Sequence, residues 1–147
     1  MSNNEDEKAL ALLEKAVYKA QDSLEKTTHF QPFLMLLTDS GKVEVYENEE
    51  EDSEKSYALL EEKLANRIEK NDIDIMILAV DTMIPEKFAS DVPIGIRLHL
   101  EEKSQRNKKM GARFLYVPYG LCKTTEGQMF VKLHLPIPVG CPAEYIK

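Results

Sequence analysis

Residues 73–80 are almost continuously apolar, and Asp72 and Asp81 bound them on either side. The run is too short for a lone buried helix, so it predicts a strand whose two faces are both covered. A strand of this kind lies in the interior of a sheet rather than at its edge. The rest of the chain must therefore supply neighbouring strands and the elements that cover them.

Two segments carry apolar residues at helical spacing and are predicted to be amphipathic helices. The first spans residues 5–26, with Asn4 in position to cap it. The second begins near Asp52 or Ser53 and ends near Asn71. The repeating apolar residues are Leu10, Leu13, Val17, Ala20 and Leu24 in the first segment, and Tyr57, Leu60, Leu64 and Ile68 in the second.

Alternating apolar residues and turn residues predict the remaining strands. The Asp39–Lys42 turn predicts a β-hairpin, and residues 94–101 alternate between an apolar face and a polar face. Besides residues 73–80, the predicted strands are 33–38, 43–46, 94–101, 112–117 and 128–135. Residues 136–147 are punctuated by prolines, and we expect them to lie extended along the surface.

The predicted order of elements is α-β-β-α-β-β-β-β in a single domain, residues 1–147. Short connections make neighbouring strands antiparallel, so we expect a two-layer α+β fold in which two amphipathic helices cover one face of a mostly antiparallel sheet. The link from Tyr46 to Ile73 contains the second helix and could instead create one parallel pair. The predicted core is Leu13, Val17, Leu60, Leu64, Ile75, Ile77, Leu98 and Leu133.

Composition narrows the class of protein. No run approaches the roughly 20 apolar residues of a membrane helix, and the first residues lack the pattern of a signal peptide, so we expect a cytoplasmic protein. In a reducing compartment Cys122 and Cys141 are expected to be free thiols. The net charge of -7 argues against nucleic-acid binding, which normally needs a basic field.

The charge is unevenly distributed along the chain. Residues 1–74 hold 19 acidic and 9 basic side chains, whereas residues 75–147 hold 7 and 10. The acidic side chains concentrate in residues 47–54, and the basic ones in the loop 102–110 and just after it. The candidate binding residues are Glu49, Glu50 and Glu51 in the acidic run, and Lys103, Arg106, Lys108 and Lys109, with Arg113, in the basic cluster. Two opposite patches favour association with a protein partner or between copies of the chain.

One group of residues points to catalysis. Asp81 follows one predicted strand, and Glu101, Glu102 and Lys103 end the next. This arrangement resembles the core of metal-dependent nucleases written PD-(D/E)xK, in which two carboxylates hold Mg²⁺ and a lysine helps to activate water. The resemblance implies roles for Asp81, Glu101 and Lys103, although Val80 stands where those nucleases have proline.

Other catalytic and cofactor motifs are absent from the sequence. The glycines form no nucleotide-binding loop, and no metal-ligand spacing of the CxxC or HExxH type is present, so no cofactor or metal is predicted. His99 and His134 are predicted on polar strand faces about 9.6 Å apart, too far to bind one metal together. They are expected to be solvated.

The sequence therefore favours a non-enzymatic protein-binding or adaptor domain, for example an immunity-type inhibitor of a basic toxin or a chaperone-like protein. The alternative is a metal-dependent nuclease that uses Asp81, Glu101 and Lys103.

Overall fold

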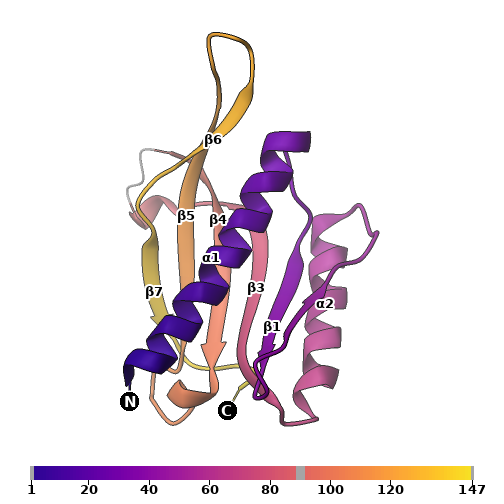
Figure 1. The fold of residues 1–147 in the computed structure, drawn as a ribbon, viewed down its shortest axis with the longest axis vertical. Helices are drawn as coiled ribbons and strands as arrows, with labels where there is room; N and C mark the ends of the chain where they lie inside the picture. Colours follow the sequence, from indigo (N-terminus) through magenta and orange to yellow (C-terminus); the bar gives the residue numbers. More distant parts are fainter. Residues whose placement is uncertain (1, 89–91, 147) are drawn as a thin grey trace.

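The computed structural model describes residues 2–88 and 92–146. It contains two helices and a curled antiparallel sheet, so the α+β class and the predicted order of elements are confirmed (Figure 1). The helices are α1 (Ser2–Thr27) and α2 (Ser53–Ile68), and the strands are β1 (Phe33–Thr38), β2 (Val43–Tyr46), β3 (Ile73–Met83), β4 (Ile94–Glu102), β5 (Ala112–Lys123), β6 (Met129–Leu133) and β7 (Ile137–Cys141). Two short 3-10 helices, η1 (Glu86–Phe88) and η2 (Lys103–Gln105), follow β3 and β4.

The strands lie in the order β2-β1-β3-β4-β5-β6, with β7 also paired to β5, and every pair is antiparallel. The apolar strand β3 lies between β1 and β4, as its composition predicts. The link through α2 joins β2 at the edge to β3 and passes β1. This resolves the alternative left open by the sequence, because the link produces no parallel pair among the described strands.

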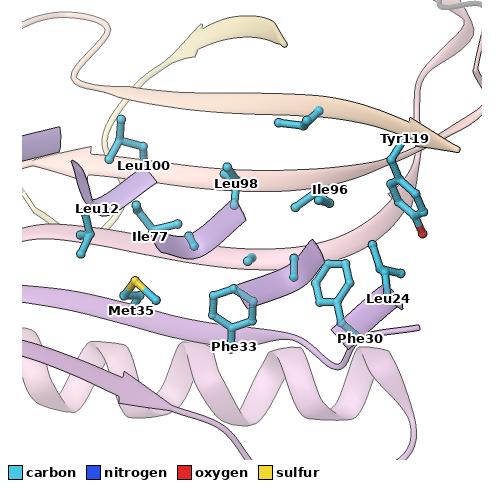
Figure 2. Close-up of a cluster of buried hydrophobic side chains, with 14 of the residues drawn as sticks. Leu12, Leu24, Phe30, Phe33, Met35, Ile77, Ile96, Leu98, Leu100 and Tyr119 are labelled. Atoms are coloured by element: carbon cyan, nitrogen blue, oxygen red, sulfur yellow. The ribbon is translucent and has the colours of Figure 1, made fainter. Parts of the chain in front are cut away.

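The two helices cover opposite faces of the sheet, not one face as predicted. On β1, Phe33 and Met35 pack in a core beneath α1, whereas Leu34 and Leu36 pack with Leu60 and Leu64 of α2. Figure 2 shows the core beneath α1, where β1, β3, β4 and β5 contribute side chains. Successive residues of a strand point to opposite faces, so the unbroken apolar runs of β1 and β3 supply both cores.

Local sequence signals define where several elements begin and turn. Asp52 caps α2 by accepting hydrogen bonds from the backbone N–H groups of Glu54 (2.9 Å) and Lys55 (3.2 Å). Gly41, with a φ of 87°, turns the β1–β2 hairpin, and Gly127, with a φ of 86°, turns the β5–β6 hairpin. Both conformations are ones that glycine adopts without the steric cost of a side chain.

The C-terminal segment is more ordered than an extended surface tail. Its β7 residues pair with the first half of β5 at the edge of the sheet, a position that tolerates Pro138. Beyond β7 the chain crosses the α2 face, where Ile146 is buried in the second core. The backbone N–H groups of Glu144, Tyr145 and Ile146 all donate to the Glu101 carboxylate, at 2.8–2.9 Å.

Candidate functional site

Helix α1 presents an apolar surface wider than the sheet beneath it can cover. Its fully buried residues are Ala9, Leu12, Ala16, Ala20 and Leu24. The adjacent stripe is less buried: Leu13 and Val17 are half-buried and Leu10 is 57% exposed. Leu13 and Val17 were predicted to be core. The helical period is correct, but the face turned to the sheet is the neighbouring one, because small alanines allow the helix to approach the strands closely.

The half-buried stripe of α1 forms one wall of an open groove of about 400 Å³. The far wall comes from the strands and the 134–136 link, and the surface exposed inside the groove is almost entirely apolar although several lining residues are polar. The lining consists of Leu10, Leu13, Glu14, Val17, Tyr18 and Gln21 from α1, and Leu115, Val117, Leu133, His134 and Pro136 from the other side. We call this feature the α1 groove. Tyr18, which lines the groove, is 72% exposed, and Leu135, in the same link as His134 and Pro136, is 88% exposed.

A β-bulge shapes the far wall of the α1 groove. Strands β6 and β7 pair with β5 one after the other, and three residues, 134–136, link them opposite only two residues of β5. A bulge of this kind re-aims side chains, and here it lets the consecutive residues Leu133 and His134, together with Pro136, line one groove. Leu133, a predicted core residue, lies in the regular ladder just before this link, opposite Tyr119, and is 36% exposed.

A polar hollow of about 420 Å³ lies on the same face of the sheet. Lys108 and Arg113 contribute positive charges to it, while among its described lining residues only Glu102 carries a carboxylate, which accepts a hydrogen bond from Arg113 at 3.1 Å. Arg113 and Leu115 lie two residues apart on one face of β5, about 6.6 Å along the strand, so the hollow continues the far wall of the α1 groove. The groove therefore has a net positive end.

The charged residues predicted to bind partners fall into two separate groups, one in the turn between β4 and β5 and the other in the link that leads into α2, on the other side of the molecule (Figure 1). In the basic loop, Lys103 forms an ion pair with Asp39 at 2.7 Å, Lys108 lines the polar hollow, and Arg106 and Lys109 are exposed. In the acidic run that precedes α2, Glu49 and Glu51 are exposed and Glu50 is half-buried. The Glu50 carboxylate accepts a hydrogen bond from the Asp52 backbone at 3.2 Å, within its own loop.

The residues of the nuclease-like pattern are not brought together. Asp81 lies on the α1 face, where its carboxylate accepts a hydrogen bond from the Tyr119 hydroxyl at 2.9 Å and burial raises its pKa. Glu101 lies on the α2 face and binds the C-terminal backbone. Asp81 pairs with Ile96, which places it about 16 Å from Glu101 along β4. Within residues 2–88 and 92–146, no group of three or more His, Cys, Asp or Glu side chains could hold a metal.

The polar face of β4 is buried instead of solvated. His99 is 2% exposed, with Nε2 2.8 Å from a Glu101 carboxylate oxygen, and its ring contacts Phe114 and Tyr145. Burial by itself would raise the pKa of Glu101, but the adjacent His99 ring and the hydrogen bonds from the three backbone amides together lower it. This cluster stabilises the C-terminal segment, so it is structural. His134 lies just beyond β6, half-buried in the α1 groove.

Sequence reasoning missed the α1 groove, although one signal was present. Residues 9–17 of α1 carry seven apolar side chains, which cover more of the helix circumference than one sheet-facing stripe requires. The 134–136 link lines the α1 groove because of the bulge, and no local sequence motif predicts that bulge.

In comparisons with known proteins, no family model, no curated protein and no solved structure matches this chain. Among the described residues, none of the helices combines the length and the apolar character needed to cross a membrane.

Proposed function

We propose that this chain is a protein-binding domain, and that it binds the amphipathic segment of a protein in the α1 groove. The observation that carries the proposal is the second apolar stripe of α1, which stays open to solvent although it continues into apolar side chains of β5 and the 134–136 link. A concave apolar surface that is open to solvent can take up the apolar side chains of a ligand.

The side chains of the α1 groove are better suited to binding a polypeptide than to catalysing a reaction. The groove is open to solvent, and its carboxylate and its imidazole, from Glu14 and His134, belong to opposite walls. The polar hollow at its end favours a carboxylate on the ligand, because Lys108 and Arg113 outnumber Glu102. The expected ligand therefore has an apolar stripe that ends in acidic side chains. An immunity-type inhibitor and a chaperone-like protein are both binders of this general kind.

Site-specific photocrosslinking in the native host cells tests the proposal. A photoreactive amino acid replaces Val17 or Leu133 in the α1 groove, and Leu59, which is 48% exposed on α2, is the control position. We expect both groove positions to crosslink to the same protein. Mass spectrometry should place the crosslink in an amphipathic segment with acidic residues at one end.

The control position decides how the crosslinks are read. Adducts that are equally frequent and equally diverse at Leu59 would show that the α1 groove has no selective ligand, and the proposed function would be wrong. Attachment of both groove positions to a small molecule or a lipid would contradict it as well.

A further inference from the structure

The α1 groove and the polar hollow together favour a ligand that has both apolar and acidic side chains. Helix α1 itself carries side chains of both kinds. Glu7, Leu10, Glu14, Val17 and Gln21 follow one another at intervals of three and four residues, so they lie on one side of the helix. Glu7 and Leu10 are exposed, and Glu14 lines the groove beside Val17. The exposed side of the helix therefore carries apolar Leu10 and Val17, with acidic Glu7 and Glu14 beside them in its N-terminal half.

We propose that the occupant of the α1 groove is a second copy of this chain, which inserts the exposed side of its own α1. This inference rests on the proposed function and names its partner. Charge complementarity supports it: the exposed side of α1 carries Glu7 and Glu14, whereas the polar hollow carries Lys108 and Arg113. The contact is self-complementary, since each copy provides both the helix and the groove, so one two-fold axis closes it as a dimer.

The charges also fix the direction of the helices. The polar hollow adjoins the turn between β4 and β5, at the end of the molecule where α1 begins (Figure 1). Acidic residues near the start of one α1 reach the hollow of the other copy only when the two helices run parallel. The two-fold axis then lies along the helices, and the acidic-to-basic contact occurs twice.

The edge of the sheet beside β7 offers a poorer contact for a second copy. Strand addition needs free backbone N–H groups along an edge, but Pro136, Pro138 and Pro142 have none. The α1 groove lies beside this edge, and its contact depends on side chains instead of backbone.

A charge-swap experiment tests the dimer. In the acidic-side variant Glu7 and Glu14 are replaced by Lys (Glu7→Lys, Glu14→Lys), and in the basic-side variant Lys108 and Lys109 are replaced by Glu (Lys108→Glu, Lys109→Glu). Sedimentation velocity at about 0.15 M salt screens the long-range repulsion between two copies of net charge -7. We expect the wild type to dimerise, and each variant alone to have a dissociation constant raised at least about tenfold.

Mixing the two variants gives the decisive result. In one groove of each mixed dimer, the lysines introduced at positions 7 and 14 meet the glutamates introduced at positions 108 and 109. In the other groove the native glutamates meet the native basic side chains, so association should recover. The control, Glu62→Lys on α2 with Glu69→Lys just after it, has the same net charge as the acidic-side variant and should dimerise like the wild type. Unchanged melting temperatures will show that the variants fold.

Three outcomes would overturn the inference. They are a wild type that stays monomeric at every concentration, variants that still dimerise alone, and a mixture that does not recover association. Failure here leaves the proposed function intact if the groove crosslinks to a different amphipathic protein. Failure of both experiments removes the groove as a binding site.

Discussion

Glu101 shows how one buried carboxylate can organise a distant segment. It is fully buried, yet the three backbone N–H groups of residues 144–146 satisfy it. We expect Glu101→Gln to lower the free energy of unfolding by about 1–3 kcal/mol, because an amide cannot accept all of these hydrogen bonds. Urea denaturation measures the loss, and hydrogen exchange should quicken at residues 144–146. Glu126→Gln, at an exposed turn, is the matched control and should change neither quantity.

A second carboxylate makes stability depend on pH. The Arg67 guanidinium binds both Glu44 oxygens, at 2.9 and 2.8 Å, and with the Tyr46 hydroxyl it lowers the pKa of Glu44 to about 2. A lowered folded-state pKa contributes stability that is complete above the ordinary value of 4.5 and is lost as the pH falls towards 2.

Glu44→Gln should therefore reduce stability near neutral pH and flatten its decline in acid. Urea midpoints at about pH 7 and about pH 3 test this, with Glu126→Gln again as the control. If wild type and Glu44→Gln decline equally between the two pH values, the ion pair does not contribute as described.

Single residues were predicted unevenly. Leu60, Leu64, Ile75, Ile77 and Leu98 are buried as expected, since each lies at the centre of a periodic segment. His99 was predicted to be exposed because polar residues alternate with apolar ones along β4. The contacts that bury it come from the C-terminal segment, about 45 residues further along the chain, and local alternation carries no information about them.

At the scale of elements, α2 and the C-terminal segment build the second core together. Leu64 is fully buried there, so Leu64→Ala should lower the free energy of unfolding by about 2–5 kcal/mol through lost burial and a residual cavity. Leu133→Ala is the matched comparison, because Leu133 is 36% exposed and should cost less than about 1 kcal/mol. Equal losses in chemical denaturation would contradict this division between core and groove.

Helix periods and strand alternation predicted the helices and strands well, but they did not predict which neighbours each element packs against. The sequence pattern of α1 allows two neighbouring faces to meet the sheet, and only the packing of Ala9, Ala16 and Ala20 selects one. The position of β7 was similarly out of reach, because its prolines exclude a central strand and still permit an edge strand.

At the scale of the whole molecule, the two cysteines lie far apart. Cys141 pairs opposite Ala112 at one end of β5, and Cys122 lies ten residues further along that strand, a separation of about 33 Å. A disulfide within one copy is therefore excluded by distance, and both thiols are free, as predicted. Under denaturing conditions without reductant, an alkylating reagent should modify both cysteines. Mass spectrometry that finds an unmodified, cross-linked chain would contradict the fold.

The assignment of helices to faces was wrong for a reason that the sequence itself contained. An amphipathic helix needs a covered face, but its period does not say which face of the sheet covers it. The continuous apolar character of β1 and β3 implies cover on both sides, and a chain with two helices meets that demand by placing one on each. The α1 groove could not be predicted, because it joins residues 10–21 to residues 115–136 through the tertiary fold.

The link between β6 and β7 contributes side chains to the α1 groove but none to either core. Deleting Leu135 would leave two residues opposite two on β5, which would bring β6 and β7 into one register while both cores kept their side chains. The same architecture is thus compatible with a chain one residue shorter, in which the 134–136 part of the far wall would change while Leu115, Val117 and Leu133 stayed in place. The 134–136 link thus adds side chains to the surface of the molecule without contributing any to either core.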